Sequence, residues 1–160
     1  MEIKQVRLEI PSGYQLILGQ SHFIKTVEDL YETLVASMPA AKFGLSFCEA
    51  SGKALIRYEG TDDDAKRISV DFATRLSAGH TFVVVLKESY PINVLNRIKA
   101  LDEVASIYCA TANTTTVIVA ETEEGNGILG VVDGVAPKGV ESEPDKIERR
   151  DFLRRIGYKR

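Results

Sequence analysis

The sequence predicts an α/β or α+β protein that folds as a single compact domain, residues 1–160, with a mixed β-sheet and about four α-helices. The chain has 160 residues, of which 44% are hydrophobic and 27% are charged. These values are typical of one globular domain. Segments with an apolar residue at every second position alternate with segments of helical periodicity, and Gly- and Pro-containing turns separate them. Such an order of elements indicates a layered fold.

The N-terminal quarter predicts two strands followed by a helix. Residues 3–10 and 15–20 read as strands, and the first shows the alternation of a half-buried strand. Residues 26–38 carry apolar side chains at the i, i+3, i+4 and i+7 positions of a helix. We expect Thr26 to be its N-cap residue and Pro39 to end it.

The middle of the chain predicts a hairpin, a helix and a central strand. Residues 43–48 and 53–58 form the expected hairpin. The helix that follows has Thr61 as its expected N-cap residue and Gly79 as its expected C′ residue. The apolar segment 80–87 predicts a central strand. Because strand, helix and strand follow one another here, we expect a right-handed crossover between two paired parallel strands.

The C-terminal third adds two helices and three strands. We expect a helix over residues 91–101, strands over 104–110, 115–121 and 128–132, and a last amphipathic helix over 142–155 that Ser142 caps. Basic and acidic residues interleave in this last helix, which favours a solvated face over contact with phosphate or a neighbouring subunit.

Charge and composition exclude several classes of protein. Lys and Arg total 20 and Asp and Glu total 23, a net charge of −3 that argues against a nucleic-acid partner. No apolar run approaches the roughly 20 residues of a membrane span, and the N-terminus does not resemble a signal peptide. We therefore expect a cytoplasmic protein without a membrane partner. Cys48 and Cys109 are expected to be reduced thiols, and the spacing of Cys and His predicts no metal site.

The segment Gly125-Asn126-Gly127-Ile128-Leu129-Gly130 matches the GxGxxG pattern of dinucleotide-binding loops. That fingerprint requires a strand before it and a helix after it. Here a strand pattern follows, so we interpret the glycines as a hairpin turn. A Walker A motif is also absent.

The two histidines are the first candidates for chemistry. His80 opens a predicted strand, near the rim of the sheet, where its imidazole can act as a base or as a nucleophile. The alternative is an ordinary loop histidine. His22 and Lys25 lie between the second strand and the first helix, where free backbone N–H groups and a positive helix end favour an anion. The alternative there is a solvated loop.

Three further side chains are candidates with a structural alternative. Glu49 follows a strand and is a candidate to orient a hydroxyl or act as a base, although most such residues are solvated. Asn93 and Asn113 lie near predicted turns, where amides can read a purine or a ribose. Capping and turn formation explain such residues equally well.

The whole chain resembles the adenosine-specific kinase family of archaea and bacteria. The similarity is carried by residues 19–32, 43–52, 79–82, 90–96, 110–113, 127–134 and 149–159, in that order. The resemblance implies an α/β homo-oligomer, a trimer or a hexamer, that binds adenosine and AMP and transfers a phosphoryl group to adenosine.

The resemblance also implies histidine phosphorylation, with His80 as the expected residue and His22 as the alternative. It implies ATP or another phosphate donor and allows Mg²⁺, for which Glu49 or Asp133 would supply oxygen ligands. Combining both arguments, we expect one cleft to gather His22, Lys25, Ser46, Glu49, His80, Asn93 and Asn113, and the alternative is a site between subunits, where residues far apart in one chain meet. Two alternatives to a kinase are an adenine-nucleotide sensor without catalysis and an oligomeric structural protein in which His80 is only packed.

Overall fold

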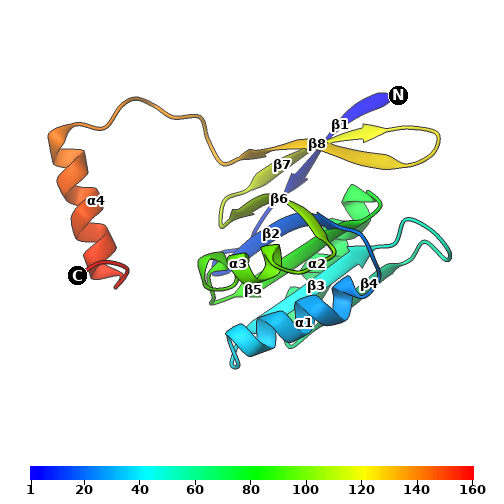
Figure 1. Cartoon of the computed structure of the whole chain (residues 1–160). Helices are drawn as coiled ribbons and strands as arrows, with labels where there is room; N and C mark the ends of the chain where they lie inside the picture. The colour runs from blue at the N-terminus through cyan, green and yellow to red at the C-terminus, as the bar shows by residue number, and fades with distance from the viewer.

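The computed structural model describes residues 1–160 and contains two antiparallel β-sheets and four α-helices (Figure 1). The expected α+β class with four helices is confirmed. In chain order the elements are β1 (Glu2–Leu8), β2 (Tyr14–Ser21), α1 (Thr26–Ser37), β3 (Lys42–Cys48), β4 (Ile56–Gly60), α2 (Asp63–Leu76), β5 (Thr81–Lys87), a 3₁₀ turn η1 (Pro91–Asn93), α3 (Leu95–Lys99), β6 (Val104–Thr111), β7 (Thr115–Glu121), β8 (Asn126–Asp133) and α4 (Glu143–Arg155).

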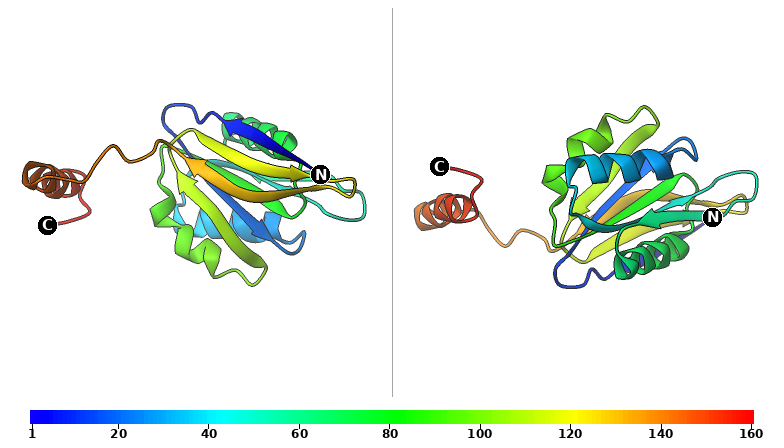
Figure 2. Two further views of the ribbon diagram at one scale, coloured as in Figure 1. Left: turned by 90° about the horizontal axis from the view of Figure 1, so that it is seen from above. Right: turned by 90° about the horizontal axis from the view of Figure 1, so that it is seen from below.

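The larger sheet has the strand order β4-β3-β5-β2-β6, and the smaller one has the order β1-β7-β8. One buried cluster joins alternate residues of the larger sheet to α1 and α3, and a second joins the other residues to α2 and the smaller sheet. The larger sheet is therefore the middle layer, with helices on one face and α2 beside the smaller sheet on the other (Figure 2). Its central strand β5 is buried on both faces.

The predicted parallel pair is wrong. β4 and β5 run in the same direction, but β3 lies between them and pairs antiparallel with both. Every pairing between named strands is antiparallel, so neither sheet is mixed. The β3–β4 hairpin, which the sequence predicted, places β3 between the two strands and so prevents the pair.

Helix α2 packs closely on β3 because Gly44 leaves room for it. A Cβ atom at Gly44 would lie 2.2 Å from the backbone nitrogen of Lys66 and 2.3 Å from the carbonyl carbon of Ala65. Any side chain there would push the helix away from the sheet. This close contact fixes α2 over the end of the sheet at which the β3–β4 hairpin begins.

Three predicted helix ends are shifted by one or two residues. Lys25, not Thr26, is the N-cap residue of α1, and the Thr26 hydroxyl instead donates to the carbonyl oxygen of Phe23 at 2.5 Å. Asp62, not Thr61, caps α2 by accepting from the Ala65 backbone N–H at 2.9 Å. The left-handed residue that ends α2 is Ser77, not Gly79.

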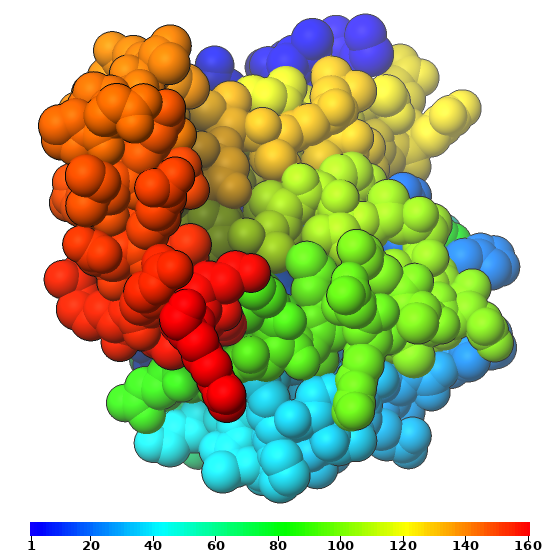
Figure 3. Space-filling view, turned by 60° about the vertical axis from the view of Figure 1, so that its left-hand side comes forward, coloured from blue at the N-terminus to red at the C-terminus, as the bar shows by residue number.

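The last helix, α4, extends away from the two sheets and the other helices (Figures 1 and 3). Ser142 caps α4 in a capping box with Asp145, which confirms the predicted start. None of the residues of α4 is buried, and residues 134–142 connect it to β8 without a helix or strand. We call residues 134–160 the C-terminal arm.

Both cysteines are buried and form no disulfide, which confirms the predicted free thiols. None of the helices combines the length and the apolar character that crossing a membrane requires.

Candidate functional site

One end of the larger sheet collects both histidines. The register pairs Gln20 with Thr81 and Ser21 with Val104, so the end of β2 lies between the starts of β5 and β6. On the other side of β5, the end of β3 reaches the same edge. Side chains that follow or precede these strands must therefore meet. We call the group His22, Lys25, Glu49, His80 and Glu103 the histidine end.

The two imidazole rings face each other edge to face, with centroids 5.5 Å apart. His80 also stacks on Phe47 at 6.0 Å and 14°. His22 is exposed and His80 is half-buried. One ring is thus held on a rigid aromatic support, while the other is open to a ligand.

Hydrogen bonds from two strands hold the backbone of His80. Its N–H donates to the carbonyl oxygen of Cys48 at 2.8 Å, and its carbonyl oxygen accepts from the Ser21 N–H at 2.9 Å. Its φ of 61° lies in the left-handed region, which residues other than glycine rarely adopt. Such strain costs about 1–3 kcal/mol and gathers at functional sites. The fold therefore maintains the position of this imidazole at a cost in stability.

Glu103 is a buried carboxylate that sequence reasoning missed. Its side chain is 2% exposed, and neither of its oxygens accepts a hydrogen bond. The nearest cation is the Lys25 Nζ, 3.5 Å away, which donates to Asp29 at 2.9 Å. The hydrogen bond to Asp29 raises the pKa of Lys25, and the charge of Glu103 adds to this shift. Glu103 stands directly before a strand that carries apolar residues, and this pattern is the signal in the sequence that indicates a buried carboxylate there.

Glu49 forms an ion pair with Arg57, a second residue that the sequence did not identify. The carboxylate accepts from the Leu55 N–H at 2.8 Å and from the Arg57 guanidinium at 3.0 Å. These two bonds, the backbone bond first, lower the pKa of Glu49. The Nε–H of Arg57 is buried and has no acceptor. Arg57 pairs with Phe47 across the hairpin, so it lies on the same face of the sheet as the ring beneath His80.

Three predicted site residues lie elsewhere in the chain, so one copy of the chain does not bring all seven together. Ser46 is buried and donates to the carbonyl oxygen of Ser69 under α2. Asn93 is exposed in η1, and Asn113 donates to Asp133 at 3.1 Å. Both asparagines follow strands at the opposite end of the sheet from the histidines. The eight residues of β2 separate the two ends by about 23 Å.

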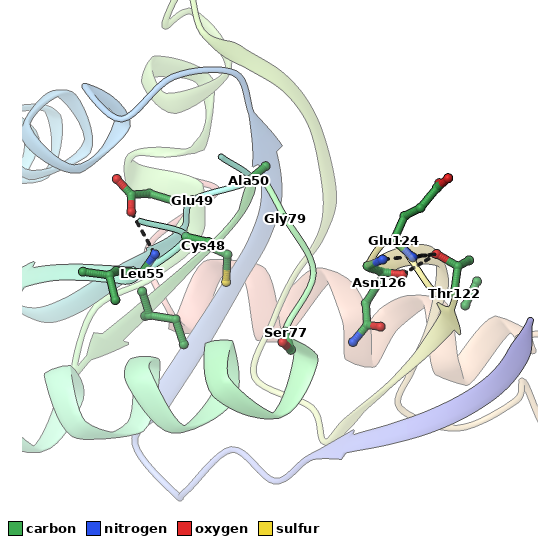
Figure 4. Close-up of a pocket in the computed structure, with 14 residues that line it drawn as sticks. Cys48, Glu49, Ala50, Leu55, Ser77, Gly79, Thr122, Glu124 and Asn126 are labelled. Atoms are coloured by element: carbon green, nitrogen blue, oxygen red, sulfur yellow. Dashed lines mark hydrogen bonds between the residues drawn. The ribbon is translucent and has the colours of Figure 1, made fainter. Parts of the chain in front are cut away.

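A cavity of about 580 Å³ lies beside the histidine end. Figure 4 shows the segments of Ala50 and Gly79 on one side of it and the turn with Thr122, Glu124 and Asn126 on the other. Its volume lies in the range of about 300–1,000 Å³ that is usual for small-molecule sites. A Cβ atom at Gly79 would lie 2.9 Å from the Ala50 Cβ, so only glycine lets the segments of Gly79 and Ala50 pack this closely on one side of the cavity.

The GxGxxG segment contributes to this cavity as a turn. β7 and β8 pair antiparallel up to Glu121 and Asn126, which confirms the predicted hairpin. Gly125 and Gly127 line the cavity. Cys48 lines it too, but burial raises the pKa of its thiol to about 11. The thiol is therefore protonated at neutral pH and is a poor nucleophile.

Possible metal ligands are dispersed in this structure. No three side chains of His, Cys, Asp or Glu gather in a group that would hold a metal ion. Glu49 is engaged by Arg57, and Asp133 accepts hydrogen bonds from Thr111 and Asn113.

Comparison with known proteins places the chain in a family. The model of the family described as "Adenosine specific kinase" matches residues 6–159, so the chain belongs to this family. A crystal structure of the PH1918 protein from Pyrococcus horikoshii OT3 is similar, with 43% sequence identity and a TM-score of 0.94. The match covers 99% of this chain and 98% of that one. A search of curated proteins found no match.

Proposed function

We propose that the protein is a phosphotransferase that converts adenosine to AMP at the histidine end, through a phosphohistidine at His80. The observation that carries the proposal is the pair of facing imidazoles, one of them in a strained backbone conformation on an aromatic support. The family description supports adenosine as the substrate. The cytoplasm is the proposed location.

The reaction would take place in two transfers. In the first, a ring nitrogen of His80 attacks the terminal phosphorus of a donor such as ATP, and the bond to the bridging oxygen breaks as ADP leaves. In the second, the 5′-hydroxyl oxygen of adenosine attacks that phosphorus, the P–N bond breaks, and the hydroxyl proton is released. A covalent intermediate divides one difficult step into two easier ones.

Cations near the rings would hold the phosphoryl oxygens. Phosphoryl transfer depends mainly on positioning and on stabilising charge. Lys25 provides one cation, and Arg57 has an N–H group that lacks an acceptor. We assign proton exchange with the phosphoryl group to His22, because its ring lies beside that of His80, with the centroids 5.5 Å apart. Because the lowered pKa of Glu49 makes it a weaker base, we assign it to orienting Arg57 rather than to taking the hydroxyl proton.

The neighbouring cavity is the proposed adenosine site. It shares the segments before His80 and after Cys48 with the histidine end, and its volume suits a nucleoside. Mg²⁺, where used, would be bound mainly by phosphate oxygens, as is usual for this ion in phosphate chemistry. Ser46, Asn93 and Asn113 remain predicted binding residues, and the two asparagines would act only from a neighbouring copy.

The test follows label from γ-labelled ATP into AMP and into the protein, with adenosine and Mg²⁺ present. We expect label in AMP and an acid-labile label on the wild-type protein. His80→Ala should abolish both, while His22→Ala, the matched control, should slow AMP formation and still allow labelling. Unchanged AMP formation in His80→Ala would refute the phosphohistidine step. Adenosine binding without any label transfer would instead support the sensor.

A further inference from the structure

The C-terminal arm carries apolar side chains that nothing in its own chain covers. Ile147, Phe152 and Ile156 are 57%, 46% and 45% exposed. Figure 1 shows the arm extending away from the two sheets, and Figure 3 shows it along one side of the molecule. A 13-residue helix is marginal in water on its own, and most helices gain their stability by packing an apolar face. The arm therefore requires a partner surface.

The arm is also basic, whereas the rest of the chain is acidic. Residues 134–160 contain eight Lys or Arg and five Asp or Glu, and the remaining residues contain twelve and eighteen. Arg150 and Arg155 form no ion pair, and Arg154 donates only to the carbonyl oxygen of Arg150. A surface that complements the arm must therefore supply carboxylates as well as apolar contact.

A groove between α1 and β4 has this composition. Its acidic part, about 280 Å³, is lined by Glu28, Tyr31, Glu32 and Glu59. None of the three glutamates has an ion-pair partner. The adjoining hollow of about 370 Å³ adds the exposed side chains of Ile24 and Tyr58. Carboxylates without counter-ions thus flank exposed apolar and aromatic surface.

We infer that the C-terminal arm of one copy of this chain docks into the α1–β4 groove of a second copy. Arginines of α4 pair with Glu28, Glu32 and Glu59, and Phe152 and Ile156 cover the apolar part of the groove. A second copy is the partner that the charges favour, because the acidic groove and the basic arm belong to the same chain. The inference concerns assembly and does not depend on the proposed function.

Two charge-reversal variants of the full chain test the inference. Glu28→Arg with Glu32→Arg reverses the groove, and Arg150→Glu with Arg154→Glu reverses the arm. The masses in solution are measured by light scattering after size-exclusion chromatography. We expect wild type to be an oligomer and each variant alone to fall to the monomer mass of 17.6 kDa. Circular dichroism verifies that both variants fold.

Mixing the two variants gives the decisive result. Each reversed groove then meets an arm of opposite charge, so the mixture should assemble into an oligomer that contains both variants, which docking within one chain would not produce. A matched control, Glu2→Arg with Glu123→Arg, reverses two exposed carboxylates elsewhere and should leave the mass unchanged. A monomeric wild type, or an oligomer that both variants retain, would overturn the inference. A monomer that binds RNA through the arm would do the same.

Discussion

The two ends of the larger sheet differ in how their polar groups are satisfied. At the end near Asn113, the Asp133 carboxylate accepts from Thr111 and Asn113, and the Thr111 hydroxyl also accepts from the Asn113 backbone. At and beside the histidine end, the carboxylate oxygens of Glu103 and the Nε–H of Arg57 are buried without a hydrogen bond, although Lys25 lies 3.5 Å from Glu103. Buried polar groups are normally paired because leaving them unpaired is costly. The comparison teaches that the two ends differ in how many polar groups lack a hydrogen bond, and this difference supports the proposal that a ligand binds at the histidine end.

The largest expected effect compares two lysines, one from each end. Lys25 faces Glu103, and Lys87 lies at the opposite end, where its ion pair with Asp62 raises its pKa. We expect Lys25→Met to lower AMP formation about 100-fold, because a preorganised donor to a developing charge contributes roughly this much. Lys87→Met should keep full turnover. Equal losses of turnover in both variants would remove the distinction between the ends.

The second prediction concerns the effect of the buried Glu103 carboxylate on stability and on turnover. Glu103→Gln replaces a buried charge, whose one ion-pair partner is the partly exposed Lys25, with a neutral group of similar shape, so the cost of burying that charge disappears. We expect a gain of about 1 kcal/mol, which raises Tm by about 2–4 °C in a protein of this size, and about a tenfold loss of turnover. Thermal unfolding and AMP formation measure the two effects. Glu88→Gln, at an exposed glutamate, should change neither, and a lower Tm for Glu103→Gln would contradict the argument.

The smallest expected effect is the pH dependence of stability at Glu49. Its pKa in the folded protein lies below the ordinary value of 4.5, so folding favours the charged carboxylate. The stabilisation is complete above the unfolded pKa and is lost as pH falls through the lower folded pKa. The difference in Tm between wild type and Glu49→Gln should therefore be largest above pH 5 and shrink toward pH 3. A difference that stays constant across this range would be the contrary result.

Local patterns in the sequence determined most of the elements. The apolar periodicity of residues 26–38 and the alternation in residues 43–48 predicted α1 and β3 to within a residue or two. Ser142 marked the start of α4, and Gly125 and Gly127 indicated a hairpin rather than a nucleotide loop. These features depend on neighbours along the chain, so the sequence alone determines them.

The tertiary structure decided what depends on distant segments. The position of β3 between β4 and β5 excluded the parallel pair, and the length of β2 separated Asn113 from the histidines. The sequence named His22, Lys25, Glu49 and His80. It did not identify Glu103 or Arg57, which are distinguished by buried polar atoms without a hydrogen bond. Burial and pairing arise only when strands from different parts of the chain meet, and no local pattern encodes which strands will do so.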